Sequence, residues 1–193
     1  MTPPQDPRAR RRAETHRRLY LAAMELFREQ GFEAVTVARI ASAARVSVPT
    51  FYDHFPSKEH IVLPLPEPAE IEQVMAEQPA TLPLGERVRG GIFSWFGSIQ
   101  GRDRDELLER WRIVVTSPGL RTRAATFERA TAEMVLEAVA PDRHEGPPPV
   151  GPGVVVSATL SAYTQILVRW AEEEGRRSLE EIAEEVLAAL RQL

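Results

Sequence analysis

"VSVPTFYDHFPSKE", residues 46–59, concentrates prolines, aromatic rings and hydroxyl groups in one short stretch. Ser47 is a good N-cap, and Pro49 then falls in the first turn of a helix, where its missing N–H costs little. Phe51 and Phe55 are spaced i, i+4, so we expect both rings to point inward from one helical face. The next proline ends the helix. The positions left to face outward come from a chemically mixed set: Ser47, Val48, Pro49, Thr50, Tyr52 and His54.

Two more helical patterns precede this stretch. Apolar side chains repeat along one face of a first helix at Leu19, Ala22, Ala23, Leu26 and Phe27. Gly31 follows as a predicted left-handed C-cap. Thr36 is placed to cap a short second helix over residues 37–44, and "ARV", residues 44–46, is the turn before the third.

Two short helices joined by so short a turn form a helix-turn-helix, whose second helix is offered to the major groove of DNA. Hydroxyl and imidazole groups can hydrogen-bond phosphates and base edges, and small apolar groups can contact thymine methyls. Lys58, the only lysine, starts a fourth helix where it is expected to meet the DNA backbone. The alternative is that Tyr52 and His54 are half-buried helix residues.

Positive charge is concentrated in the N-terminal third of the chain, and negative charge in the rest. The net charge is −4, but residues 1–60 hold ten Lys and Arg against seven Asp and Glu, a net of +3. The remaining residues hold 14 against 21, a net of −7. Residues 1–12 are expected to form a flexible basic arm that meets phosphates through Arg10, Arg11 and Arg12. A solvated, disordered arm is the alternative.

The rest of the chain is predicted to be helical. "LPLPEP", residues 63–68, breaks any continuous helix, and a short helix over about residues 69–77 follows. Further amphipathic helices are expected over residues 84–99, 107–115 and from 120, and "PDRHEGPPPVGPG", residues 141–153, is predicted to be a loop. A largely apolar helix comes next, and a last helix begins with a capping box of Ser178 and Glu181. The predicted fold is all-α, with a DNA-binding domain over residues 13–60 and a larger domain over residues 61–193.

"TVARIASAARVSVPTFYDHFPSKEHIV", residues 36–62, preceded by "AAMELFREQGFEAVTV", residues 22–37, resembles the DNA-binding module of the TetR family of transcriptional regulators. The resemblance implies an all-α homodimer whose N-terminal modules read two half-sites of a palindromic operator on double-stranded DNA. It also implies that the C-terminal domain binds an inducer and dimerises through the last two helices. The family's contact positions correspond to Thr36, Ser47, Thr50, Tyr52, His54 and Lys58. Pro49 departs from the glycine or other small residue that the family often has there.

An enzyme, a cofactor and a metal site are not expected. The chain has no cysteine, its four histidines form no ligand pair, and no nucleophile or nucleotide-binding motif is present. The apolar segments are judged too short or too interrupted for a membrane span or a signal peptide, so a cytoplasmic protein without a membrane partner is expected.

Aromatic residues suggest where an apolar or aromatic effector ligand binds. The set of aromatic and Met side chains is Trp95, Phe96, Trp111, Phe127, Met134, Tyr163 and Trp170, and the polar candidates for orienting a ligand are Arg112, Thr131 and Gln165. Core packing is the alternative for each of these side chains, and the last two helices could instead pack only within their own chain.

The predicted function is a homodimeric repressor that a ligand releases from DNA. Two alternatives remain: a small-molecule carrier of the same fold, and a dimeric scaffold that no longer reads DNA. The basic N-terminus and the intact "TFYDHFPSKE" favour the regulator.

Overall fold

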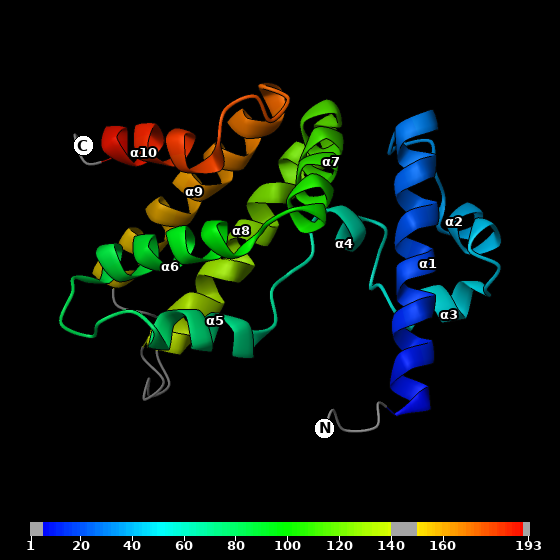
Figure 1. Cartoon of the computed structure of the whole chain (residues 1–193), viewed down its shortest axis with the longest axis horizontal. Coiled ribbons are helices and arrows are strands. Elements are labelled where there is room, and N and C mark those ends of the chain that lie inside the picture. Colours follow the sequence, from blue (N-terminus) through cyan, green and yellow to red (C-terminus); the bar gives the residue numbers. More distant parts are fainter. Residues whose placement is uncertain (1–5, 140–149, 191–193) are drawn as a thin grey trace. The chain divides into compact units, whose positions relative to one another are not determined.

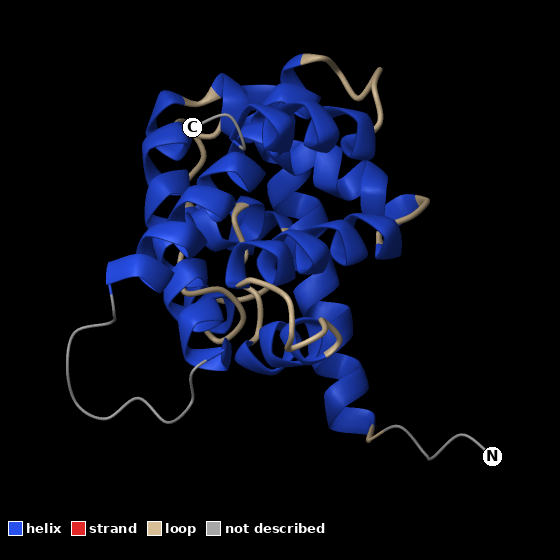
Figure 2. Cartoon of the chain, turned by 90° about the vertical axis from the view of Figure 1, so that its left-hand side faces the viewer, coloured by secondary structure: helices blue, strands red, loops and turns tan. Residues whose placement is uncertain are grey.

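A computed structural model describes residues 6–139 and 150–190, and all of the secondary structure in these residues is helical (Figures 1 and 2). The chain divides into two compact units, residues 1–64 and residues 65–193. The predicted domain boundary after residue 60 therefore falls four residues later. The helices are α1 Pro7–Gln30, α2 Val37–Ala43, α3 Val48–Tyr52, α4 Glu59–Val62, α5 Pro68–Ala76, α6 Leu84–Ser98, α7 Arg102–Thr116, α8 Pro118–Val139, α9 Val150–Glu172 and α10 Leu179–Leu190.

Short-range caps shape the N-terminal unit as the sequence predicts. The Thr36 hydroxyl oxygen accepts the Arg39 N–H, and the Ser47 hydroxyl oxygen accepts the Thr50 N–H, both at 3.2 Å. Helix α1 packs on α2 and α2 on α3. The shared core consists of Leu19, Ala23, Phe27, Val35, Ile40, Phe51 and Phe55.

The turn between α2 and α3 has a residue that is not glycine in the left-handed region. Arg45 has φ 55°, and the Val46 N–H donates to the Ala41 carbonyl at 2.9 Å. The Arg45 N–H donates to the Ser42 carbonyl at 3.0 Å, so the two bonds close α2 with a Schellman motif. Gly31 ends α1 at φ 79°, ψ 151°, which is a glycine conformation but not the left-handed helical one that was predicted.

The flexible arm predicted for residues 1–12 is wrong for residues 7–12, which are the first turns of α1. The Asp6 carboxylate accepts the Arg8 N–H at 3.0 Å and so caps the helix, and Arg10 pairs with Glu14 at i, i+4. These local contacts stabilise a helix despite the run of like charges. Residues 1–5 lie outside the described part of the chain.

The break at "LPLPEP" is confirmed. Residues 64–67 are non-helical, and α5 begins at Pro68 behind a capping box formed by Glu67 and Glu70. A proline at the first helical position is tolerated because its N–H would have no partner there.

Helix α9 is the centre of the C-terminal unit, where it packs against α6, α7, α8 and α10 (Figure 1). Its buried side chains include Val156, Leu160, Ile166, Leu167 and Trp170. Helix α9 has 23 residues and an 18-residue window with a mean hydropathy of 1.2, so by length and composition it could cross a membrane, which the sequence did not lead us to expect. Only 33% of its apolar window is buried within the C-terminal unit, and the valines at its start are exposed.

The loop predicted over residues 141–153 is wrong at its end, because residues 150–153 are already helical in α9. Residues 140–149 lie outside the described part. The capping box of α10 is confirmed: the Ser178 N–H donates to the Glu181 carboxylate at 2.9 Å, and the Glu181 N–H donates to the Ser178 hydroxyl at 3.1 Å.

Candidate nucleic-acid interface and effector site

Helix α3 presents one buried and one exposed face. Phe51 is fully buried, while 54% of Tyr52 is exposed, and the two rings meet edge to face with their centroids 5.4 Å apart. Ser47, Val48 and Pro49 are also exposed, and Thr50 is half-buried. The outward positions expected from the sequence therefore do face outward at the start of α3. The Ser47 and Thr50 hydroxyls lie 2.8 Å apart, so each orients the other.

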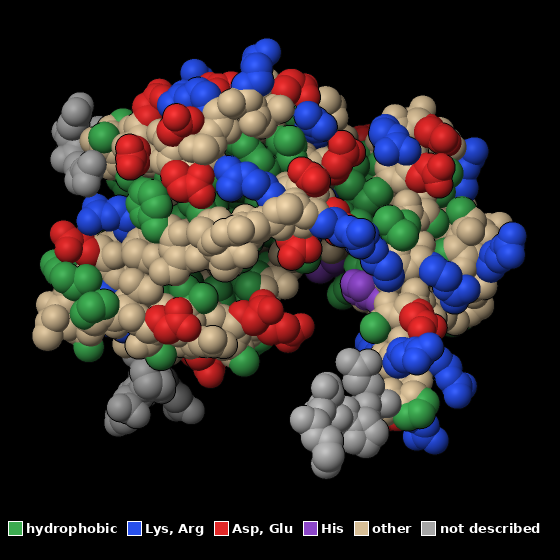
Figure 3. Space-filling model, in the orientation of Figure 1, with side chains coloured by type: hydrophobic (Ala, Val, Ile, Leu, Met, Phe, Trp, Pro, Cys, Tyr) green, Lys and Arg blue, Asp and Glu red, His purple; other side chains and the backbone are tan. Residues whose placement is uncertain are grey.

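Exposed arginines lie in the other parts of the helix-turn-helix. Thr36 and Arg39 are exposed at the start of α2, and Arg45 is exposed in the turn. Figure 3 shows Lys and Arg side chains gathered over the N-terminal unit. Arg39 and Arg45 were not among the predicted DNA contacts, although both lie inside the helix-turn-helix at positions without an apolar role.

Lys58 does not have the outward placement expected from the sequence. Its ammonium group donates to the carbonyls of Phe32 and Val35, both at 2.8 Å, and lies 4.3 Å from the centre of the Phe32 ring. These carbonyls belong to the segment between α1 and α2, whose backbone groups need partners outside a helix. Lys58 therefore ties the start of α4 to the turn that leads into α2.

His54 lies in a small cluster between α1 and the end of α3. Its ring centroid is 5.8 Å from that of His16, which stacks on Phe55 at 4.3 Å. The Arg12 guanidinium donates to the Asp53 carbonyl at 2.9 Å, so this arginine is held at the end of α3. His54 is half-buried, and its Nδ1 is buried without a hydrogen-bond partner in the described residues.

This histidine cluster predicts a loss of stability in acid. Burial, followed by the positive charge of Arg12, lowers the pKa of His54, and Asp53 offsets part of that shift. Burial, followed by the charges of His54 and Arg12, lowers the pKa of His16. The unfolded chain therefore binds protons first as the pH falls through about 6.5, and the contribution of the neutral rings is progressively lost below that pH. We expect the melting temperature of the N-terminal unit to fall between pH 7 and pH 5.

Thermal unfolding of the wild type and of a His16→Gln, His54→Gln double variant across this pH range tests the prediction. Both proteins share all other titrating groups, so the variant should lose less stability than the wild type. Identical pH profiles would show that the two rings do not contribute.

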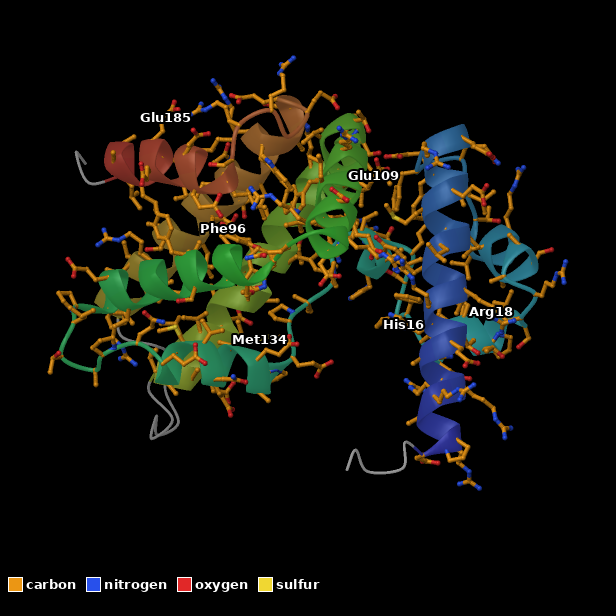
Figure 4. All side chains as sticks on the ribbon, in the orientation of Figure 1. His16, Arg18, Phe96, Glu109, Met134 and Glu185 are labelled. Carbon is orange, nitrogen blue, oxygen red and sulfur yellow. The ribbon has the colours of Figure 1, made fainter. Side chains whose placement is uncertain are left out.

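The C-terminal unit contains an aromatic cluster on α6 and α9. Trp95 and Tyr163 meet edge to face at 5.7 Å, and Phe96 stacks on Tyr163 at 5.8 Å. Phe96, labelled on α6 in Figure 4, is fully buried. Trp111 is buried as well, so both side chains belong to the core. The other aromatic and Met candidates for ligand contact are half-buried: Trp95, Phe127, Met134 and Tyr163.

The polar candidates in this unit are not where the sequence suggested. Arg112 pairs with Glu109 at 3.0 Å and with Glu174 at 2.9 Å, and the Thr131 hydroxyl donates to the Phe127 carbonyl within its own helix. Gln165 is exposed on α9. Arg110 and Arg112 each have a buried Nε without a hydrogen-bond partner in the described residues. Arg104 and Arg112 also meet carboxylates far along the chain, Glu180 and Glu174, and sequence spacing could not predict these two pairs.

The exposed α3, the capped turn and the exposed arginines of α2 and the turn define a helix-turn-helix protein of the DNA-binding class. No cluster of three potential metal ligands occurs among residues 6–139 and 150–190.

Residues 19–65 match the family model for bacterial regulatory proteins of the tetR family, and residues 82–193 match a model for an MftR C-terminal domain. The chain therefore belongs to the TetR family of transcriptional regulators. This confirms the resemblance and the all-α fold inferred from the sequence.

The chain is similar to two curated regulators. It is 34% identical over 137 residues to the HTH-type transcriptional regulator TcmR of Streptomyces glaucescens, over 66% of this chain and 58% of TcmR. It is 42% identical over 60 residues to the HTH-type transcriptional regulator YdeS of Bacillus subtilis, over 31% of this chain and 30% of YdeS. The matches thus span just over half of one relative and under a third of the other.

A solved structure shares the fold. NalD of Pseudomonas aeruginosa, described as the secondary repressor of the MexAB-OprM multidrug efflux pump, superposes with a TM-score of 0.61. The match covers 93% of this chain and 96% of NalD at 20% identity.

Proposed function

We propose that this regulator is a cytoplasmic repressor that binds a palindromic operator as a homodimer and is released by a small apolar or aromatic effector. The exposed face of α3 is the observation that carries the proposal. Ser47, Thr50 and Tyr52 supply hydroxyl groups, and Val48 and Pro49 supply apolar surface, as base edges and thymine methyls require. The arginines of α1 and α2 supply the positive charge that phosphates attract.

Release follows from linkage. Two half-sites of a palindrome lie about 34 Å apart, so a dimer binds both only when its two α3 helices have that spacing. Suppose that the effector binds more tightly to a conformation in which the two α3 helices have another spacing. The effector then weakens DNA binding, and the loss in binding free energy equals the difference between its binding free energies for the two conformations. Residues 63–67 are the covalent connection between the two units and are the place where we expect this change to be transmitted.

The DNA-binding proposal predicts that Tyr52→Ala loses operator affinity while the protein stays folded. Removing an exposed ring with a hydroxyl should weaken specific binding about 10- to 100-fold, because one good base contact contributes about 1–3 kcal/mol. Selection of bound fragments from genomic DNA identifies the operator, and titration of that operator with the wild type and the variant measures the loss.

Leu82→Ala is the matched control for Tyr52→Ala, because Leu82 is an exposed apolar side chain in the C-terminal unit. It should leave operator affinity unchanged. Recovery of fragments without a common palindrome, or equal affinity of the wild type and the Tyr52 variant, would reject the proposed operator readout and favour the carrier or scaffold.

The dimer is proposed to form through α9 and α10. Val150, Val154 and Val155 are exposed large apolar side chains at the start of α9, with Val154 61% exposed. The outward side of α10 carries glutamates, including Glu185 (Figure 4), so the apolar part of the proposed interface comes from α9 and α10 contributes polar groups beside it. Such an apolar face needs a partner surface in water, and a second copy of α9 supplies one of the same chemistry.

The dimer proposal predicts that Val154→Glu shifts the protein from dimer to monomer by burying a carboxylate in the interface. Sedimentation equilibrium over a concentration series measures the shift, which should exceed tenfold in the dissociation constant. Thr122→Glu, at an exposed position of α8, is the control and should leave the mass unchanged. A Val154→Glu protein that remains dimeric would place the interface elsewhere.

A further inference from the structure

The turn between α2 and α3 holds a long side chain in a backbone conformation that favours glycine. Arg45 has φ 55°, and among residues 6–139 and 150–190 only Glu174 also has a positive φ without being glycine. Both residues occupy the same position of a Schellman motif, because the Gly175 N–H after Glu174 donates to the Trp170 carbonyl at 2.9 Å. A residue with a Cβ is strained in this conformation, whereas glycine is not.

Contacts within the chain account for Glu174 but not for Arg45. The Glu174 carboxylate pairs with Arg112 at 2.9 Å, so this residue links the end of α9 to α7. The Arg45 side chain is exposed and forms no hydrogen bond or ion pair with any other residue that the structure describes. Strained backbone residues are concentrated at functional sites. The contact that offsets the strain of Arg45 is therefore expected from a group outside the chain.

The position of Arg45 in the helix-turn-helix indicates what that group is. Residues 36–55 contain two Lys or Arg residues, which are Arg39 near the start of α2 and Arg45 just after its end. In a helix-turn-helix the first helix crosses the DNA backbone while the second enters the major groove. Cations at the two ends of α2 are therefore expected beside the phosphates that flank the groove. Lys58 does not supply this charge, because its ammonium group is bound to two backbone carbonyls.

The backbone of Arg45 is fixed relative to α3. The Arg45 N–H donates to the Ser42 carbonyl at 3.0 Å, and Ser47, two residues further on, caps α3. The base of the side chain is thus held at the start of the helix that reads the groove. The planar guanidinium then offers several N–H donors in a geometry that matches two phosphate oxygens.

We propose that Arg45 contacts a DNA phosphate beside the major groove that α3 enters. The left-handed turn thereby places a cation where glycine would leave none. A phosphate contact positions the protein on the duplex and contributes to the binding of any sequence. This inference rests on the proposed function, because it adds a contact to the proposed operator interface.

Three substitutions separate the charge of Arg45 from its backbone strain. Arg45→Gln removes only the charge, so it should weaken operator binding about tenfold at an unchanged melting temperature. Arg45→Gly removes the charge and the strain, so it should weaken binding equally but raise the melting temperature by about 2–4 °C. Arg45→Lys keeps both and should bind within about threefold of the wild type. Calorimetry measures the melting temperatures.

The salt dependence of binding identifies a phosphate contact. Affinity is measured over a salt series for the operator selected from genomic DNA and for an unrelated duplex of the same length. On both duplexes, loss of the charge should reduce the slope of log affinity against log salt by about one per bound subunit. Glu174→Gly is the matched control, because it replaces a residue in the same backbone conformation. It should leave affinity and slope unchanged.

Two results would overturn the phosphate contact: wild-type affinity and salt slope in Arg45→Gln, or a loss confined to the operator. A melting temperature that falls in Arg45→Gly would overturn the argument from strain. A palindrome bound equally by the wild type and the Arg45 variants would reject this inference and keep the proposed function. If the wild type selects no palindrome, the proposed function is rejected, and a reduced salt slope of Arg45→Gln on the unrelated duplex would still support the contact.

Discussion

Lys58→Met is expected to lower the free energy of unfolding of the N-terminal unit by about 3 kcal/mol, because two hydrogen bonds to a charged donor are lost. Methionine keeps an unbranched apolar stem but leaves the carbonyls of Phe32 and Val35 without their protein donor. The contact between the ammonium and the Phe32 ring is lost as well. Urea unfolding measures the loss, and hydrogen exchange locates it at the end of α1 and the start of α2.

The salt dependence of operator binding distinguishes this role from a phosphate contact. Lys58→Met should weaken binding because the helix-turn-helix is less stable, with little change in the slope of log affinity against log salt. Arg39→Met is the matched control, since Arg39 is an exposed cation on α2. It should change stability by less than about 0.5 kcal/mol while reducing the salt slope by about one. A Lys58→Met protein of normal stability with a reduced salt slope would instead support the phosphate contact that the family resemblance implies.

Phe96→Ala is expected to destabilise the C-terminal unit by about 3–5 kcal/mol, the usual cost of removing a fully buried phenyl ring. Its ring stacks on Tyr163 and contacts Trp95, so the truncation also disorders the aromatic cluster. Near-ultraviolet circular dichroism and chemical unfolding measure the two effects.

Phe93→Ala is the control for this truncation, because Phe93 lies on the same helix but is only half-buried. Its cost should be clearly smaller, since less apolar area leaves water on folding. A Phe96→Ala protein that keeps its stability, or equal costs for both substitutions, would show that Phe96 is not a core residue and would return it to the candidate ligand contacts.

The family and the helix-turn-helix could be read from the sequence because they depend on short-range patterns. Thr36, Ser47 and the pair of Ser178 and Glu181 cap helices within three residues of themselves. Such contacts need no knowledge of the rest of the fold. Asp6 caps α1 and Arg10 pairs with Glu14 through contacts of the same short range. These contacts could have been used to predict that α1 includes the run of arginines, which was instead interpreted as an arm.

The candidate site was harder to predict because its members are charged or aromatic side chains with several available partners. Trp95 and Phe96 are adjacent in sequence, yet one is half-buried and the other fully buried, which depends on how α6 is rotated against α9. Arg110 and Arg112 are two residues apart, yet only Arg112 meets the Glu174 carboxylate beyond α9.

The sequence by itself determined the all-α class, the helix-turn-helix, the outward residues at the start of α3 and the break between the two units, because each follows from periodicity, caps and prolines. Only the tertiary structure decided that Lys58 holds the turn between α1 and α2, and that Arg112 meets the Glu174 carboxylate beyond α9. The physical reason is that a long charged side chain binds whichever partner the fold brings within its reach. That partner is 23 residues away in sequence for the Lys58–Val35 contact and 62 residues away for the Arg112–Glu174 contact.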